Sequence, residues 1–250
     1  MQNSFSRTQL LLGSQTMEKL SSARVAVFGI GGVGGYVCEG LVRSGVGSFD
    51  LIDDDKICLT NINRQIIAKH STVGQYKCDV MQERMLDINP DVKISVHKCF
   101  FLPENAHEFD FTKYDYIVDA VDTVSAKIEI IVKAQSCGVS VISCMGAGNK
   151  LDPTALKVAD ISETKVCPLA RVMRRELKKR GVEHLKVVYS EEQPVRIENE
   201  NSENCLTDCI SRTETRQNVT PRRATPGSVA FVPSVAGLII AGEVIKDLIK

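Results

Sequence analysis

The sequence lacks net charge, because 31 lysines and arginines balance 31 aspartates and glutamates over 250 residues. No global field therefore draws the protein to nucleic acid or to an anionic membrane, and any such attraction must come from a local patch. The sequence also lacks an apolar run of the ~20 residues that a membrane span needs. The longest candidate, residues 228–241, contains Pro233 and is followed by Glu243 and Lys246. We expect a buried terminal helix there and no membrane partner.

No Cys-x-x-Cys pair occurs, although the chain has nine cysteines. A structural zinc held by two such pairs is therefore not expected, and the nearest spacing is Cys205-x-x-x-Cys209. The N-terminus is polar and shows no secretory leader. Reduced thiols and a cytoplasmic location are the simplest interpretation. A catalytic thiol stays open as a minor alternative, at Cys205, at Cys209 or at Cys167 before Pro168.

What the sequence does contain is a regular alternation of strand and helix patterns. Runs rich in β-formers occupy residues 24–28, 49–52, 92–96, 116–118 and 139–143. Helical patterns occupy residues 10–20, 36–43, 75–88 and 125–136. This alternation predicts an α/β, Rossmann-like fold, with a mostly parallel sheet and helices on both faces.

The pattern changes after Gly148. Strands are predicted at 154–159 and 185–189, a basic helix at 168–180, a crossover loop at 190–227, and then the terminal helix. We interpret residues 1–150 as one domain and residues 151–250 as a smaller C-terminal extension that continues the sheet.

A glycine-rich turn directly follows the first strand, where residues 29–34 (GIGGVG) fit G-x-G-x-x-G. Gly29 permits the tight turn, Gly31 lets a phosphate approach the backbone, and Gly34 lets the helix pack closely on the sheet. The amides and dipole of a helix N-terminus attract the anion. Asp53 lies 19 residues past Gly34, where an acid can accept hydrogen bonds from a ribose. Together these features predict an adenine-nucleotide site.

Nicotinamide-dependent oxidoreductases share this fingerprint, so charge must separate the two classes. A dinucleotide has two phosphate charges, whereas ATP has about four, and cleavage between its α and β phosphates needs cations at the leaving pyrophosphate and usually Mg²⁺. The sequence supplies such groups downstream of Asp53: residues 61–65 (NINRQ), residues 73–77 (VGQYK) and residues 119–122 (DAVD). Ligands bind at the carboxyl ends of parallel strands, so Asp122 is placed to reach a metal ion.

At these residues the chain resembles the ubiquitin-activating-enzyme-like adenylyltransferases, strongly over residues 5–150. The resemblance implies an ATP-binding adenylation domain in which Asp53 holds the ribose, Arg64 and Lys77 hold the phosphates, and Asp122 holds Mg²⁺. It implies that ATP is contacted by Gly29, Gly31, Gly32, Gly34, Asp53, Asp55, Asn61, Arg64, Gln65 and Lys77. Arg7 matches an N-terminal arginine that enters the neighbouring subunit's ATP site in relatives, which implies a homodimer and a catalytic role for Arg7 beside Arg64, Lys77 and Asp122.

Two acceptor substrates fit this superfamily. One is the C-terminus of a ubiquitin-like sulfur carrier, whose activating enzymes often hold the zinc that is not expected here. The other is threonylcarbamoyladenosine in tRNA, because the C-terminal half (PLARVMRREL, VVYSEEQP) resembles the branch that dehydrates this nucleoside. Adenylation of its threonine carboxylate would let the neighbouring urea-like group close a ring and expel AMP, and proximity would make that closure fast. A sulfur-transfer partner, which some relatives have, is left open.

A tRNA substrate requires a basic surface, and the predicted helix 168–180 offers one. Leu169, Val172, Met173 and Leu177 form its expected buried stripe, so its basic residues should point to solvent. The expected nucleic-acid-binding residues are Arg171, Arg174, Arg175, Lys178 and Lys179, with Arg222 and Arg223 as a second pair. A solvated helix face explains the same charges equally well.

Overall fold

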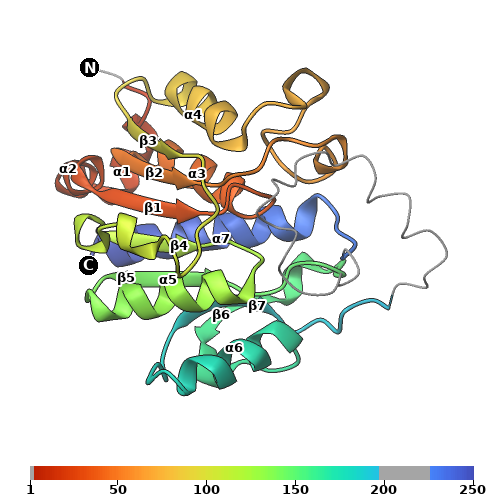
Figure 1. Cartoon of the computed structure of the whole chain (residues 1–250). Helices are drawn as coiled ribbons and strands as arrows, with labels where there is room; N and C mark the ends of the chain where they lie inside the picture. The colour runs from red at the N-terminus through yellow and green to blue at the C-terminus, as the bar shows by residue number, and fades with distance from the viewer. Residues whose placement is uncertain (1–2, 197–225) are drawn as a thin grey trace.

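Seven strands form one continuous sheet in the computed structural model, which describes residues 3–196 and 226–250 (Figure 1). The strand order is β3-β2-β1-β4-β5-β7-β6, and every neighbouring pair is parallel except β6 with β7. The strands are β1 (Arg24–Phe28), β2 (Ser48–Ile52), β3 (Lys93–His97), β4 (Tyr116–Asp119), β5 (Ser140–Cys144), β6 (Leu156–Asp160) and β7 (Lys186–Ser190). The predicted Rossmann-like α/β fold is confirmed.

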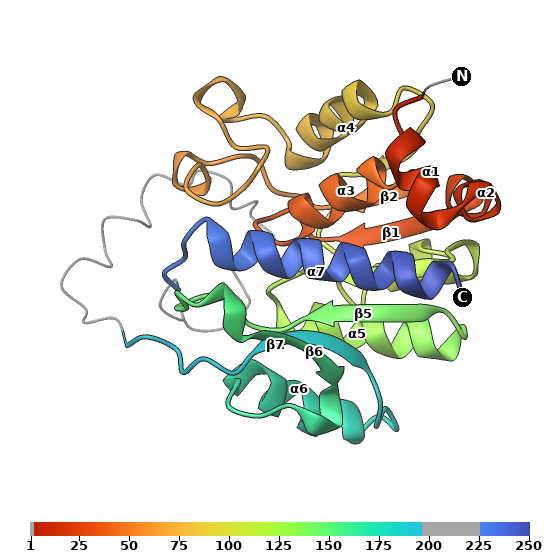
Figure 2. The ribbon, with the colours of Figure 1, turned by 180° about the vertical axis from the view of Figure 1, so that it is seen from behind.

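Helices cover both faces of the sheet, as the front and back views show (Figures 1 and 2). One face carries α3 (Gly34–Arg43), α4 (Lys77–Ile88) and α7 (Phe231–Leu248). The other carries α5 (Val124–Ser136) and α6 (Pro168–Lys178). Each face has its own apolar core, and burial of these side chains provides the main stabilising free energy. Short 3-10 turns occupy Leu59–Asn61, His70–Thr72, Ala106–Glu108, Phe111–Lys113, Pro153–Ala155 and Ile161–Glu163.

The chain reverses its winding between β1 and β4. Strands β2 and β3 extend the sheet to one side of β1, and β4 and β5 extend it to the other side. In open α/β sheets, ligands bind outside the carboxyl ends of the strands at such a switch point. The glycine-rich turn follows β1 at this place.

The N-terminal arm differs from its prediction. In place of one helix over 10–20, the structure has α1 (Ser6–Leu12) and α2 (Ser14–Ser22). Gly13 separates them with φ +84°, a left-handed conformation that glycine adopts without strain and that interrupts a helix. The other predicted strands and helices are present, with ends that shift by a few residues.

The C-terminal part continues the same sheet through β7 and β6, and α7 then returns to pack on α3. Division of the chain at residue 150 stays an interpretation. Most of the expected crossover loop, with Cys205, Cys209, Arg222 and Arg223, lies outside the described residues. Within the described ranges, no helix combines the length and apolar character that a membrane crossing requires.

Candidate nucleotide-binding site

The glycine-rich turn is shaped by two close approaches of the backbone. Gly29 has φ +89°, and a Cβ atom there would lie 2.7 Å from the carbonyl oxygen of Ala120. Its N–H donates to the carbonyl of Ile52 at 2.8 Å. A Cβ atom at Gly34 would overlap the carbonyl oxygen of Gly29. Only glycine fits both positions, so the turn brings the first amides of α3 to the carboxyl edge of β1.

Asp53 follows β2 and is fastened to this turn. Its Oδ2 accepts from the backbone N–H of Ile30 at 2.7 Å, and its Oδ1 accepts from the N–H of Asp55 at 2.8 Å. The carboxylate is therefore fixed beside the glycines, at the place expected for a ribose contact.

Lys77, the first residue of α4, points into this acidic corner. Its Nζ lies 2.7 Å from Oδ2 of Asp55 and 3.7 Å from Oδ1 of Asp53. Burial alone would lower the pKa of Lys77, but the two carboxylates outweigh burial and raise it. The ammonium group is therefore charged at neutral pH and held in one place.

Residues 61–65 form another side of the site. Arg64 donates from Nη1 to the carbonyl of Thr60 and to Oδ1 of Asn63, both at 3.0 Å. Asn61 accepts through Oδ1 from the N–H of Cys58 at 3.1 Å. Gln65 is 6% exposed, and its Oε1 is a buried oxygen without a hydrogen-bond partner. A buried orphan of this kind calls for an explanation, such as a ligand.

One cavity of about 400 Å³ collects these groups. Asp122, just beyond β4, is exposed in it and accepts from the hydroxyl of Thr123 at 3.3 Å. The cavity is lined by Gly29, Gly31, Gly32, Asp53, Asp55, Asn61, Arg64, Gln65, Lys77 and Asp122, together with Cys58, Cys99, Phe100, Phe101, Ala120, Val121 and residues 226–228. Most of the residues that the sequence placed at the phosphates, the ribose and the metal thus lie around a single hollow, whereas Gly34, also expected to contact ATP, is buried and does not line it.

Arg7 does not line this cavity. It is exposed on α1, which lies at the end of β1 opposite to the glycine-rich turn in both views (Figures 1 and 2). Within one chain it is therefore remote from the nucleotide site.

Helix α6 is basic, but its side chains point differently from the expectation. Ala170, Met173 and Leu177 are buried, whereas Leu169 and Val172 are only partly buried. The expectation that Arg174 points to solvent is wrong.

Arg174 turns back toward the chain that precedes α6. Its Nη1 donates to the carbonyls of Ile161 and Thr164 at 3.2 and 2.9 Å and to the hydroxyl of Thr164 at 2.8 Å. Arg175, Lys179 and Arg180 pair with Glu176. Arg171 and Lys178 are exposed.

Sequence reasoning missed a buried charge network beneath Asp122. Lys127 and Asp119 are both 0% exposed, with Nζ 3.0 Å from Oδ2. The hydroxyl of Ser143 donates to Asp119 at 2.5 Å, and Lys127 also donates to the carbonyl of Val121 at 3.0 Å. A signal was present in the sequence, because Lys127 falls on the apolar face of its helix with Ile131 at i+4.

The family model named ThiF family matches residues 5–250. The chain belongs to the ThiF family. The tRNA threonylcarbamoyladenosine dehydratase of Bacillus subtilis (strain 168) is 41% identical to this ThiF-family protein over 251 residues, covering 100% of this chain and 96% of that protein. The resemblance to the adenylyltransferase superfamily is confirmed.

Solved structures agree with this placement of the ThiF-family protein. E. coli tRNA N6-threonylcarbamoyladenosine dehydratase, TcdA, in complex with ATP superposes with a TM-score of 0.82 at 30% identity, covering 98% of this chain and 93% of that one. E. coli MccB with ATP superposes with a TM-score of 0.65 at 22% identity, covering 100% and 64%. The second similarity shows the fold alone.

The cavity of this ThiF-family protein suits a triphosphate with Mg²⁺. The side-chain Nε2 of Gln65, a hydrogen-bond donor, lies beside Gly31, and Arg64 and Lys77 supply positive charge. Mg²⁺ is usually held by one or two carboxylates together with substrate phosphates. Asp122 has such a carboxylate. In contrast, two of the three clustered carboxylates at residues 53–55 face the ammonium group of Lys77.

Proposed function

We propose that this protein uses ATP to convert threonylcarbamoyladenosine in tRNA into its cyclic, dehydrated form. The observation that carries the proposal is the single cavity in which the glycine-rich turn meets Asp53, Arg64, Lys77 and Asp122. The relatives named as dehydratases of this nucleoside, one of them 41% identical over the whole chain, supply the substrate.

The reaction follows from the chemistry of the substrate. An oxygen of the threonine carboxylate attacks the α-phosphate of ATP, so that pyrophosphate leaves and an acyl-adenylate forms. The urea-like group beside it then attacks the acyl carbon, the ring closes, and AMP leaves with the carboxylate oxygen. The nucleoside thereby loses one water, and no protein nucleophile is required because the attacking group is already in place.

The side chains of this chain bind and orient the reactants. Asp53 accepts hydrogen bonds from the ribose, and Arg64 and Lys77 stabilise negative charge on the departing pyrophosphate. Lys77 exchanges its contact with Asp55 for a phosphate oxygen. Asp122 holds Mg²⁺, which neutralises phosphate charge when bound.

The partners follow from the same proposal. Arg171, Arg175 and Lys178 on α6, and Lys179 directly after it, contact tRNA phosphates, whereas Arg174 holds the chain before α6. We place the protein in the cytoplasm, where the tRNA is.

We also propose a homodimer in which Arg7 completes the partner's nucleotide site. Leu10 and Leu11, near Arg7 on α1, are 89% and 85% exposed. Neighbouring exposed leucines mark an interaction surface, and an interface there would cover them.

Mass spectrometry of tRNA nucleosides tests the proposed function directly. After incubation of modified tRNA with the protein and ATP, the nucleoside should lose the mass of one water while AMP and pyrophosphate accumulate. The Asp122→Asn variant should bind ATP but leave the nucleoside unchanged.

Unaltered nucleoside with the wild-type protein would contradict the proposal. ATP–pyrophosphate exchange that is stimulated by a sulfur-carrier protein ending in Gly-Gly would favour that protein as the acceptor. A thermal shift with NAD(H) and none with ATP would favour an oxidoreductase.

A further inference from the structure

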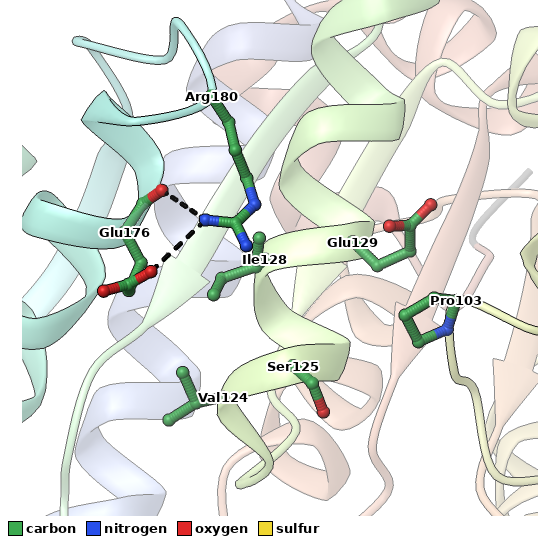
Figure 3. A pocket seen from close by; sticks show the side chains of 7 residues that line it. All are labelled: Pro103, Val124, Ser125, Ile128, Glu129, Glu176 and Arg180. Atoms are coloured by element: carbon green, nitrogen blue, oxygen red, sulfur yellow. Dashed lines mark hydrogen bonds and ion pairs between the residues drawn. The ribbon is translucent and has the colours of Figure 1, made fainter.

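A second hollow lies between α5 and α6, and no role in ATP chemistry accounts for it. Its volume is about 310 Å³, at the lower end of the roughly 300–1,000 Å³ typical of small-molecule sites. We call it the α5–α6 groove (Figure 3). Its lining residues are Pro103, Val124, Ser125, Ile128, Glu129, Glu176 and Arg180.

The groove combines apolar, flat and hydrogen-bonding groups. Val124 and Ile128, one helical turn apart on α5, offer apolar surface. Arg180 reaches from the turn after α6 across to α5, while the ring of Pro103 lies beyond Glu129 (Figure 3). A guanidinium group is a planar surface on which an unstacked RNA base can lie.

The charge of the groove selects against an anion. Glu129 and Glu176 outnumber Arg180, and Arg180 donates from Nη1 to the carbonyl of Glu176 at 2.7 Å and to its Oε2 at 3.4 Å. The cation that lines the groove is thus already paired, and Glu129 adds a carboxylate, so the lining offers no unpaired cation to a free phosphate or carboxylate. The carboxylate of Glu129 and the hydroxyl of Ser125 can accept from N–H groups. A flat, neutral heterocycle with N–H donors on its edge satisfies all of these groups.

The position of the groove ties it to the nucleotide cavity. Phe101 and Asp122 line the nucleotide cavity, and Pro103 and Val124 line the groove. Phe101 and Pro103 are two residues apart in the chain, and so are Asp122 and Val124. Two residues span at most about 7 Å, so the two hollows are close neighbours. Glu176, which lines the groove, pairs with Arg175 and Lys179, so basic side chains of this region adjoin the groove. An RNA strand can therefore place phosphates on α6 and a base in the groove.

We propose that the α5–α6 groove binds an unstacked nucleobase that directly neighbours the modified adenosine of the substrate tRNA. The proposal rests on the proposed function, because it takes the RNA substrate from there. The groove contributes affinity and register: it fixes the strand so that the modified nucleoside reaches the ATP site.

An RNA-binding cycle tests the groove. Anticodon stem–loops that contain the target adenosine are titrated by fluorescence polarisation, with each base flanking the target replaced in turn by an abasic residue. With the wild-type protein, one flanking position should weaken binding about tenfold, because a stacked base is lost. Ser125→Phe fills the groove, so it should weaken binding of the complete RNA by a similar factor and abolish the response to that abasic position. Arg180→Ala should reduce the same response without filling the groove.

The matched control is Ser136→Phe, which places the same side chain on the same helix. Ser136 is exposed in the last turn of α5, about 17 Å from Ser125 at 1.5 Å per residue. This variant should keep the full response to the abasic position.

The outcomes separate the groove from the proposed function. No abasic response at any flanking position in the wild-type protein, or an unchanged response in both Ser125→Phe and Arg180→Ala, would overturn the nucleobase proposal while leaving cyclisation intact. An abasic response that both groove variants reduce, found with a wild-type protein that does not cyclise modified tRNA, would support the groove and contradict the proposed function. If the wild-type protein bound none of the RNAs, both would be wrong.

Discussion

Lys127 places a positive charge where no water reaches it, directly beneath the nucleotide cavity. Removing two charges from water costs several kcal/mol per ion, and only good geometry with additional hydrogen bonds offsets that cost. Here the Asp119 carboxylate pairs with Lys127 and accepts hydrogen bonds from the Ser143 hydroxyl and the N–H of Val121. Lys127 also donates to the carbonyl of Val121. The network therefore fixes the backbone one residue before Asp122.

Removal of Lys127 should destabilise the fold because it leaves the Asp119 carboxylate buried without its partner. Lys127→Met should lower the free energy of unfolding by about 3–5 kcal/mol, measured by urea denaturation. Adding Asp119→Asn removes the unpaired charge and keeps an amide oxygen for Ser143, so the double variant should recover much of the loss. An unfolding midpoint for Lys127→Met equal to that of the wild-type protein would show that the ion pair contributes nothing.

The residues of the site differ in how far sequence can predict them. Gly29, Gly34 and Asp53 stand at fixed spacings that local backbone geometry requires, so their places were predictable. Lys77 and Arg64 required the resemblance to a family, because a lone cation in a sequence equally fits a solvated surface. The groove was not predictable, since Pro103 and Glu176 meet only after the chain has folded.

At the scale of elements, α6 shows that a basic helix is not a uniform basic surface. Its periodicity predicted the helix correctly, but the direction of Arg174 depends on carbonyls from residues 161–164, ten or more positions away. Glu176 also gathers three of the cations around itself. The exposed side chains of Arg171 and Lys178 remain the strongest candidates for phosphate contacts.

Two sets of substitutions on α6 should therefore affect different properties, tRNA binding in one case and folding stability in the other. Arg171→Ala with Lys178→Ala should weaken tRNA binding. The slope of log binding constant against log salt concentration should become shallower by about 1.5, since each lost phosphate contact contributes roughly 0.7–0.9 to that slope. Arg174→Ala should instead lower stability by about 1–3 kcal/mol, because the carbonyl of the buried Thr164 loses this donor. Filter binding over a salt series and urea denaturation measure the two effects. Loss of tRNA affinity in Arg174→Ala at unchanged stability would reverse this assignment.

Two carboxylates of the terminal helix α7, Glu243 and Asp247, pair with Lys186 of the sheet. Asp247 accepts from Lys186 of β7 at 2.6 Å, from Tyr116 of β4 at 2.7 Å and from Lys250 at 2.8 Å. Burial alone would raise the pKa of Asp247, but these hydrogen bonds outweigh burial and lower it from 3.8 to about 2. Because the folded pKa lies below the unfolded one, the stabilisation is complete at neutral pH and is lost as the pH falls from about 4 to about 2.

The Asp247→Asn variant should show this dependence on pH. At pH 7 it should be less stable than the wild-type protein by about 1–2 kcal/mol, and the difference should shrink to roughly half at pH 3. Urea midpoints at pH 7, 5, 4 and 3 measure it. A difference that stays constant over this range would mean that packing, not charge, holds α7.

At the scale of the whole molecule, the fold separates two parts of the proposed active site. The cavity opens at the carboxyl ends of β1, β2 and β4, whereas Arg7 lies on α1 at the other end of β1. Sequence patterns predicted the strand and helix order that creates this separation. They could not show which chain uses Arg7, because that depends on a second molecule.

Mixing two inactive variants decides whether Arg7 acts across a dimer interface. Arg7→Ala should lack the arginine in its partner's site, and Asp122→Asn should lack the metal-holding carboxylate in its own site, so each alone should be inactive. In a mixed dimer, one of the two sites receives Arg7 from the Asp122→Asn chain and Asp122 from the Arg7→Ala chain. Because random exchange makes half of the dimers mixed, cyclisation should return to roughly a quarter of the wild-type rate. Native mass spectrometry verifies the exchange, and a mixed sample that stays inactive would place Arg7 outside the partner's catalytic site.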